Sequence, residues 1–424
     1  MSTADPDLRV PVRNFNHHKD PALRVDPFTA FDRFRDEPIF WTPELDGFWV
    51  LTRYADIREV LRDGETFSSR HTLIPPIEWP RDQASRGQRE SADWAGYRKL
   101  LVHSVTGPAG AAVASAVERA CVRLVTHLAP LGRCDLVADF AQPLRDALFA
   151  ALFDVPEAET ERCARWASDL LQGDDPDRRL RAAQDFKAYV GQGIAACAGG
   201  ERTGTGLLHA LATAEVDGRP LRADEAADLA FKMGIGSVDT ITNSIGFSFR
   251  YLATHPDLRR RLATESAAAA PAAEELLRLH SVACVARVAT RDTEIAGTRV
   301  RAGERILLSL ALADRDPHQY PDPASADLDR PDRTSHLAFG SGAHRCVGAR
   351  IASQALTVAL REWHATIQDY ALAEDADPRT AGGAVWSLDT LPLTWPVPDV
   401  HEVRDVPARQ RYDLDEVRQQ GGTL

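Results

Sequence analysis

The spacing of apolar and polar residues predicts a chain that begins with a small β-hairpin and continues mostly as helices. Residues 38–51 hold two apolar runs on either side of a turn at 44–47, which is typical of a hairpin. The spacing becomes helical over 54–62 and again from 108 to about 245, where a turn at Asp217 and Gly218 interrupts it. We therefore expect a helical body with its first strands near the amino end.

A second region of short strands is predicted after residue 287. Residues 292–300 and 306–308 have strand-like composition with glycine turns, and a proline-rich irregular stretch follows at 317–331. A last helix is expected over 348–364 and a closing strand over 391–395. The pattern indicates a mainly α fold with a minor β lobe, arranged as one domain over 1–398 with a charged C-terminal extension over 399–424.

Composition narrows the class of protein. The 424 residues carry a formal net charge of −12, which argues against non-specific binding to nucleic acid. The chain has no apolar run long enough for a membrane span, and its first residues lack the apolar stretch of a secretory signal. Its six cysteines are widely spaced and form no CxxC pair, which argues against a disulfide framework or a zinc finger and favours a reducing, cytoplasmic environment.

The segment with the most chemical information is the glycine-rich run 339–348, which carries Cys346 just before the last predicted helix. Three glycines in so short a run predict backbone that bends tightly or approaches a neighbour closely. A helix N-terminus beside the sulfur lowers the pKa of a thiol, and backbone N–H groups of the loop can bond the thiolate. From the residues alone, Cys346 is either a metal-binding thiolate or a small buried apolar side chain in a turn.

A second unusual segment lies in a long helix predicted over 224–254, capped at Asp224 and ended near 255–256. At about 1.5 Å per residue, this helix spans roughly 45 Å. Gly234 and Gly236 cost about 1 kcal/mol each in a helix interior, and Thr240 can bond back to a carbonyl one turn earlier. A helix with such a cost either has something flat lying against it or is kinked within the core.

The run 339–348 reads F-G-S-G-A-H-R-C-V-G and resembles the haem-binding signature F-G-x-G-x-H-x-C-x-G of the cytochromes P-450. The resemblance extends over about residues 15–397 and implies the fold of that family, a triangular prism of helices around a buried haem b. It implies that Cys346 holds the iron as the proximal thiolate, that Phe339 shields the sulfur and that His344 bonds a haem propionate. Gly340 and Gly348 are expected at the same cofactor site.

The middle of the long helix resembles the family's motif (A/G)-G-x-(D/E)-T at residues 236–240. The resemblance implies that Gly236 contacts the cofactor and that Asp239 and Thr240 form the catalytic acid–alcohol pair, which relays protons during dioxygen cleavage. Two positions depart from the pattern: Ser237 replaces the usual second glycine, and Ile241 replaces a frequent threonine. Ser237 either narrows the oxygen groove or adds a hydroxyl to the relay.

Three charged residues match the structural motifs of the same family. Glu275 and Arg278 fit E-x-x-R, and Arg330 fits the end of F-D-x-x-R, although Ala326 replaces its phenylalanine. The resemblance implies that these three charges pin the loop that carries the thiolate.

Two further arginines, Arg98 and Arg287, stand where the family places propionate-binding arginines. Trp94 departs from the pattern, because a histidine or another polar residue usually lies four positions before the first of these arginines. We expect both arginines at the cofactor, with Trp94 donating no more than its indole N–H.

By resemblance, the substrate is bounded by the loop 73–82, the long helix, the segment 283–286 and the turn 384–386. The side chains expected to contact it are Leu73, Lys232, Ile235, Val285 and Val385. Lys232 lies eight residues before the expected relay threonine and so faces roughly the same side of the helix. It either pairs with a carboxylate or phosphate on the substrate, or covers apolar surface with its stem while the ammonium reaches water.

Together the motifs imply a haem-dependent monooxygenase, similar to the camphor-hydroxylase-like group of bacterial P-450s, that inserts one oxygen atom from dioxygen into a small organic substrate. Its expected partners are an iron–sulfur ferredoxin with its reductase, docked on a basic patch formed by Arg98, Lys99, Arg345 and Arg350. We expect a monomer with no nucleic-acid or membrane partner. The alternatives are a peroxygenase and a non-catalytic haem protein that senses gas or recruits a carrier protein; the acid–alcohol pair argues against both.

Overall fold

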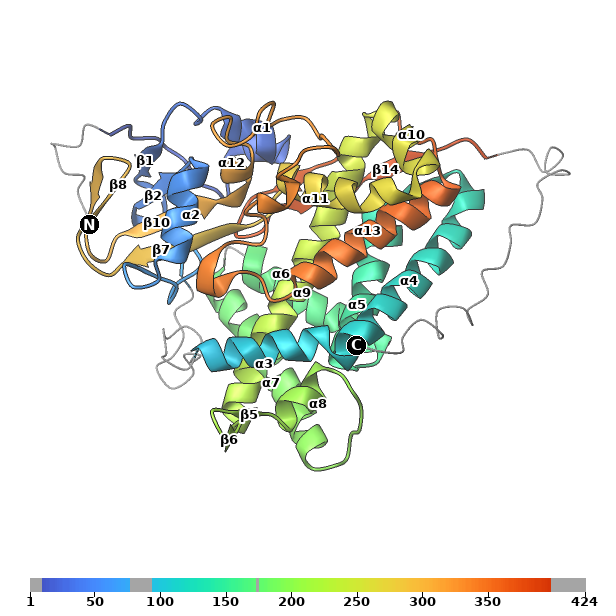
Figure 1. The fold of residues 1–424 in the computed structure, drawn as a ribbon, viewed down its shortest axis with the longest axis horizontal. Coiled ribbons are helices and arrows are strands. Elements are labelled where there is room, and N and C mark those ends of the chain that lie inside the picture. Colours follow the sequence, from blue (N-terminus) through green and yellow to red (C-terminus); the bar gives the residue numbers. More distant parts are fainter. Residues whose placement is uncertain (1–9, 77–93, 173–174, 398–424) are drawn as a thin grey trace, which may run out of the picture.

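The computed structural model describes residues 10–76, 94–172 and 175–397. Within them, a large helical body stands beside a smaller lobe built on a five-stranded sheet (Figure 1). The mainly α fold with a minor β lobe is therefore confirmed. Residues 77–82 of the expected substrate loop and the extension 399–424 lie outside the described residues, so the division of the chain near residue 398 stays a prediction.

The helices follow the predicted order along the chain. They are α1 Pro27–Asp32, α2 Tyr54–Arg62, α3 Trp94–Thr106, α4 Pro108–Leu128, α5 Gln142–Phe153, α6 Thr160–Gln172, α7 Pro176–Ala198, α8 Leu207–Ala212, α9 Ala223–Ala253, α10 Pro256–Thr264, α11 Ala269–Leu279, α12 Leu310–Asp314 and α13 Ala349–Thr366.

The strands are short, and most of them belong to hairpins. They are β1 Ile39–Thr42, β2 Phe48–Leu51, β3 Phe67–Ser68, β4 Arg133–Asp135, β5 Glu215–Val216, β6 Arg219–Pro220, β7 Cys284–Ala289, β8 Thr293–Ile295, β9 Thr298–Val300, β10 Arg305–Ser309, β11 Ala371–Leu372, β12 Thr380–Ala381, β13 Ser387–Leu388 and β14 Pro392–Thr394.

The smaller lobe is organised by a sheet in the order β1-β2-β10-β7-β3. β1 and β2 form the predicted hairpin, with Ile39 opposite Leu51, and Gly47 closes the turn at φ +85°. The predicted turn at Asp217 and Gly218 joins β5 to β6, with both residues at positive φ. The expected closing strand is β14, which pairs with β4 and β11 and ties the carboxyl end to the helical body.

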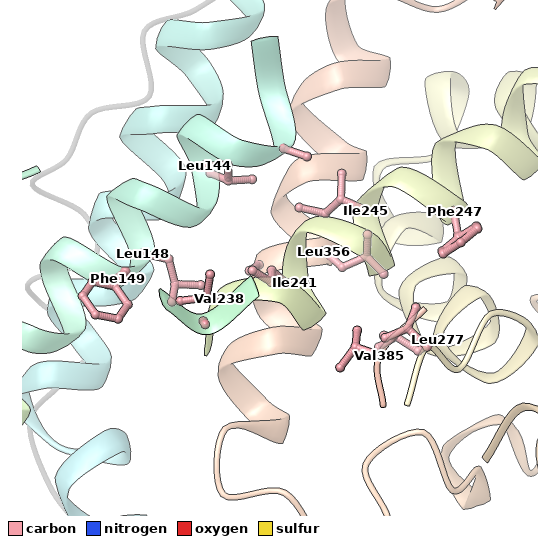
Figure 2. Packing of buried hydrophobic residues seen from close by; sticks show 14 of the residues in the cluster. Leu144, Leu148, Phe149, Val238, Ile241, Ile245, Phe247, Leu277, Leu356 and Val385 are labelled. Atoms are coloured by element: carbon pink, nitrogen blue, oxygen red, sulfur yellow. The ribbon is translucent and has the colours of Figure 1, made fainter. Parts of the chain in front are cut away.

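The helical body is built around α9, whose 31 residues span about 45 Å. This helix packs against α5, α6, α7 and α13. Figure 2 shows Leu144 and Leu148 of α5 gathered with Ile241 and Ile245 of α9 and Leu356 of α13, and all five side chains are buried. The fixed position of α9 in this apolar core gives the side chains along its length defined places.

The start of α9 differs from the prediction. Its N-cap is Arg222 rather than Asp224, and the Glu225 carboxylate accepts the Arg222 N–H at 3.1 Å. Glu225 also accepts the Tyr97 hydroxyl at 3.0 Å, whereas Asp224 pairs with the Arg222 side chain in the first turn. The assignment of Asp224 as the cap is wrong because a tertiary contact, invisible in the local sequence, fixes Glu225 at this end.

The two glycines in the middle of α9 have different neighbours. A Cβ placed on Gly234 would lie 2.5 Å from the Phe186 ring of α7, whereas a Cβ on Gly236 would meet nothing within 4 Å. Close helix packing therefore accounts for Gly234. Only Gly236 faces open space, as expected for a helix with a ligand lying against it.

No single helix in the described ranges is long and apolar enough to cross a membrane. The helix pair Trp94–Thr106 and Pro108–Leu131, bent by 44°, passes the length and composition test when taken together.

Candidate active site

A cavity of about 410 Å³ lies between α9 and the loop that precedes α13. Its volume falls within the range of small-molecule pockets. Most of its wall is apolar, and side chains from α3, α5, α9, α11, β7 and the cysteine loop contribute to it. The apolar side chains of this wall are Leu61, Trp94, Leu101, Leu148, Leu152, Met233, Ile241, Leu277, Val282, Ala283, Val285, Leu310, Ala338, Phe339, Val347, Ile351 and Ala352.

The cysteine loop forms one wall and is tightly folded. Gly340 and Gly342 both adopt positive φ, at +67° and +72°. A Cβ on Gly342 would lie 2.8 Å from the backbone oxygen of Leu61 at the end of α2, so the loop also makes the close approach that its glycines predict. The Cys346 N–H donates to the Phe339 carbonyl at 2.8 Å, which closes the loop and leaves the thiol facing the cavity.

The electrostatic environment of Cys346 differs from the prediction. The thiol faces the cavity rather than open solvent, and the surrounding protein desolvates it, which raises its pKa above the ordinary value. The Gly348 N–H and the charges of Arg345 and Arg98 act in the opposite direction. The expected lowering by the helix N-terminus is therefore outweighed by burial, although the predicted backbone bond to the sulfur is present.

The opposite wall comes from α9. Gly236 exposes its backbone there, and the Thr240 hydroxyl donates to the Gly236 carbonyl at 2.7 Å, which is the backward bond that the sequence predicts. The Ser237 hydroxyl also lines the cavity and donates to the Gly234 carbonyl at 2.9 Å. Two hydroxyls therefore face the thiol wall, and each is held by the helix backbone.

Asp239 lies on another side of the same helix. Successive residues of an α-helix point about 100° apart, and Asp239 lines a second, polar cavity of about 390 Å³ together with Arg145, Asn243 and Ser387. Its side chain is buried, with 7 % exposed. The structure therefore does not bring Asp239 and Thr240 together in one cavity, although they are adjacent in sequence.

The three residues predicted to hold propionates all line the first cavity. They are Arg98, Arg287 and His344. Arg98 donates to the Arg345 carbonyl at 2.6 Å, and the His344 ring bonds the Ser69 hydroxyl at 2.9 Å. Ser69 has no motif around it, so only the folded chain reveals this contact.

Trp94, the departure from the family pattern, supports the cysteine loop. Its indole N–H donates to the Ala343 carbonyl at 3.0 Å. Its ring stacks on the His344 ring with centroids 5.0 Å apart. In place of a propionate donor, this position carries a side chain that packs on the loop and orients the histidine.

The residues predicted to contact substrate divide into two groups. Lys232 and Val285 line the cavity. Leu73, Ile235 and Val385 are not among the residues that line it, so their contact with substrate stays a prediction. Ile235 precedes Gly236, and the helical period turns it away from the cavity. Leu73 packs against the core. Val385 is buried beside Leu277 (Figure 2) and forms an isolated β-bridge with Ala283.

Several lining residues were missed by the sequence reading. Leu148 and Leu152 come from α5, Met233 and Ser244 from α9, and Leu101 from α3. The α5 leucines carry only the helical spacing of any core residue. Nothing in that spacing indicates which of them faces a cavity.

Three predicted structural charges meet in the core behind the cysteine loop. Glu275 and Arg278 are 0 % exposed and Arg330 is 4 % exposed. Each Glu275 oxygen accepts from Arg278 at 2.9 Å, and one also accepts from Arg330 at 3.0 Å. Arg278 donates further to the carbonyls of Asp314 and Pro323, at 2.7 Å and 2.9 Å.

This network sets the ionisation of Glu275. Burial alone raises the pKa of its carboxyl group, but hydrogen bonding and charge from Arg278, together with the Asp327 N–H and Arg330, outweigh burial and lower the pKa below the ordinary value. The carboxylate therefore stays charged at neutral pH, as two buried guanidinium groups require.

Asp314 connects this network to the cysteine loop. Its carbonyl accepts from Arg278, and its carboxylate accepts the Leu337 N–H at 2.6 Å and the Ser281 hydroxyl at 2.5 Å. Leu337 lies two residues before Phe339. Burial raises the pKa of Asp314 to about 6, with the nearby His336 and these hydrogen bonds opposing it.

Comparison with known proteins identifies related chains over almost the whole length. The family model described as Cytochrome P450 matches residues 200–378. A protein named "Probable cytochrome P450 127A1" from Sinorhizobium fredii is 31% identical over 91% of this chain and 94% of its own. The crystal structures of CYP101J2 and CYP101C1 both superpose with a TM-score of 0.82 at 28% identity; they cover 93% and 92% of this chain, and 100% and 99% of their own.

Replacing Glu275 by glutamine should destabilise the folded protein strongly. The change leaves two buried guanidinium groups without their counter-ion, and breaking a buried pair costs about 3–5 kcal/mol. Urea unfolding of the haem-loaded protein measures this loss. Glu265→Gln is the matched control, because Glu265 pairs with Arg261 at 3.1 Å on the surface, where such pairs contribute about 1 kcal/mol or less. Equal unfolding midpoints for the two variants would contradict the assigned role of the network.

Proposed function

Because the chain belongs to the cytochrome P450 family, whose members are haem b monooxygenases, we propose that Cys346 is the thiolate that holds its haem iron. The observation that carries this proposal is the cavity itself. A loop cysteine faces it from one wall, and a glycine and two hydroxyls of α9 face it from the other. The reaction proposed is insertion of one atom of dioxygen into a small organic substrate.

The wall of the cavity fits a haem. A flat apolar group with two carboxylates requires apolar surface and cationic donors, and both are present at one site. Arg98, Arg287 and His344 would hold the propionates, Phe339 would shield the sulfur, and the open faces of Gly236 and Gly340 leave room beside the ring. When bound, haem supplies the iron at which dioxygen is reduced and cleaved.

The chain's own contribution to that chemistry is the delivery of protons. Thr240, which lines the cavity, is proposed to donate a proton from its Oγ1. Asp239 is proposed to exchange protons with the polar cavity on the other side of α9. Because the two side chains face different cavities, the relay runs across the helix.

The same pair separates this proposal from its alternatives. A peroxygenase receives its oxygen as hydrogen peroxide, which brings its own two protons, and a non-catalytic gas-binding protein does not cleave dioxygen, so neither requires protons delivered through the chain. Thr240 faces the same space as Cys346, and this favours the monooxygenase.

We propose an iron–sulfur ferredoxin as the electron donor and a monomeric, cytoplasmic protein. Lys99, Arg345 and Arg350 are exposed, and the half-buried Arg98 next to Lys99 donates to the Arg345 carbonyl at 2.6 Å. On a chain with net charge −12, a local group of cations attracts an acidic partner to one place and leaves the rest of the surface repulsive. All six cysteines are free thiols, as a reducing compartment requires.

Replacing Cys346 by serine tests the central assignment. A neutral hydroxyl is a poor donor to iron, so the reduced carbon-monoxide complex should lose the red-shifted absorption band of thiolate-ligated haem. Cys284→Ser is the control, because this cysteine is buried in β7 and does not line the cavity. Retention of the band in Cys346→Ser would remove Cys346 as the ligand.

Replacing Thr240 by alanine should preserve haem binding and oxygen consumption while diverting electrons to hydrogen peroxide. Loss of the hydroxyl lets protons reach the wrong oxygen atom. The ratio of peroxide to product, measured with a surrogate ferredoxin system, is the readout. If Thr240→Ala stays coupled and Ser237→Ala becomes uncoupled, the relay hydroxyl belongs to Ser237.

Reversing Lys99 and Arg350 to glutamate should slow reduction by ferredoxin several-fold at low ionic strength while substrate binding stays intact. The difference should shrink as salt rises toward about 1 M, where the Debye length is roughly 3 Å. Arg181→Glu with Arg260→Glu is the control, because it makes the same charge change on α7 and α10. An unchanged reduction rate in the first variant at low salt would mean that the donor docks elsewhere.

A further inference from the structure

One cation in the cavity has no assigned partner. Lys232 of α9 lines the cavity, two helical turns before Thr240. Its Nζ lies 5.8 Å from the centre of the Trp94 ring. Within the described part of the chain, no carboxylate forms an ion pair with it. The acid one turn earlier, Asp228, pairs with Lys187 of α7 at 2.5 Å.

The surroundings make this cation costly. The side chain is half-buried, and most of its neighbours on the cavity wall are aliphatic or aromatic. Desolvation lowers the pKa of Lys232 to about 8, Asp228 acts against that shift, and Lys187 adds to it. The ammonium is therefore mostly charged at neutral pH, and a charge that is partly removed from water without a counter-ion is unfavourable.

Contact with Trp94 offsets only part of that cost. A cation near an aromatic face is attracted only weakly compared with a cation that has a full counter-ion, and the indole N–H of Trp94 is already directed to the cysteine loop. The alternative, in which the stem covers apolar surface and the ammonium reaches outer water, fits less well because the side chain faces the cavity. Lysine is also rare in this chain, since only Lys19, Lys99, Lys187 and Lys232 among its 50 basic residues are lysines and the others are arginines.

Resting on the proposed monooxygenase function, we propose that Lys232 makes the cavity selective for substrates that carry a carboxylate. A single ammonium matches one negative charge, and the aliphatic wall matches an apolar remainder. Arg98, Arg287 and His344 are assigned to the carboxylates of the cofactor, which leaves Lys232 for the substrate.

The position of Lys232 also constrains where oxidation occurs. Lys232 and Thr240 are separated by eight residues, or about 12 Å along the helix axis. A substrate anchored at Lys232 therefore presents a carbon several bonds from its carboxylate to the reacting centre. Oxidation is expected along the apolar part of the molecule, away from the carbon next to the acid group.

The experiment compares haem-loaded wild type with Lys232→Met and Lys232→Arg. Each protein is titrated with octanoic, decanoic and dodecanoic acids and with the matching primary amides, which keep the shape and remove the charge. Affinity is measured both by calorimetry and by the haem spin-state shift. Lys19→Met is the matched control, because Lys19 is exposed and lies outside the cavity wall.

The wild type should bind at least one acid more tightly than its amide. Lys232→Met should lose about ten- to hundredfold of acid affinity and leave the amides unchanged, as expected for one charge-assisted hydrogen bond. Lys232→Arg should recover most of the preference, and Lys19→Met should match wild type. Equal binding of acids and amides by wild type, or an unchanged preference in Lys232→Met, would overturn the proposal.

Haem content and the reduced carbon-monoxide band are measured in every variant. If Lys232 instead binds a haem propionate, Lys232→Met loses haem and keeps its ratio of acid to amide affinity, which also overturns the proposal. A wild-type protein without the thiolate band would refute the proposed monooxygenase function but not the carboxylate selectivity. Calorimetry measures that selectivity independently of the iron ligand.

Discussion

A buried guanidinium group has five N–H donors and a charge that cannot be removed at any physiological pH. Arg278 and Arg330 bring two such groups into the core, and the Glu275 carboxylate between them is the counter-ion that makes this possible. The remaining donors reach main-chain carbonyls of the irregular segment after α12, so this segment has a fixed shape without regular secondary structure. Through Asp314, the same constraint extends to Leu337 and thus to the start of the cysteine loop. The position of Cys346 therefore depends on charges that lie well outside the cavity.

The cavity places different chemistry on its two walls. The loop wall is tightly folded, because its glycines occupy positive-φ positions and the Cys346 N–H bonds back to the Phe339 carbonyl. The α9 wall is a continuous helix whose hydroxyls bond its own carbonyls, so Thr240 and Ser237 are available without breaking the helix. Asp239 lines a separate polar cavity, so the acid and the largely apolar reaction space lie on different sides of α9. Lys232 is the one charged residue that α9 contributes to the described lining of the cavity, and this is the basis of its proposed role in substrate choice.

Elements whose formation depends on residues close together in the sequence were predicted well. The β1–β2 hairpin, the β5–β6 turn and the ends of α2 follow from apolar spacing and turn residues. The tight backbone bend at the glycines of the cysteine loop and the hydrogen bond from Thr240 to the carbonyl one turn earlier were also predictable, because each depends on residues close in sequence. The cap of α9 was not, because Glu225 is held by Tyr97 of the distant helix α3 as well as by the nearby Arg219. The same reason explains Leu73, Ile235 and Val385: which side of an element faces a cavity is decided by packing between elements. The separation of Asp239 from Thr240 follows from the helical period, which turns adjacent residues about 100° apart, whereas the motif alone implies that the two act as a pair.

The central claim is that Cys346 binds the haem iron in the cavity opposite Thr240. X-ray absorption at the iron edge, recorded on the haem-loaded wild-type protein, tests this claim most directly because it reports the atoms bonded to iron. The account predicts one sulfur neighbour in addition to the four porphyrin nitrogens, and loss of that sulfur when position 346 holds serine. An iron with only nitrogen and oxygen neighbours in the wild-type protein would contradict it.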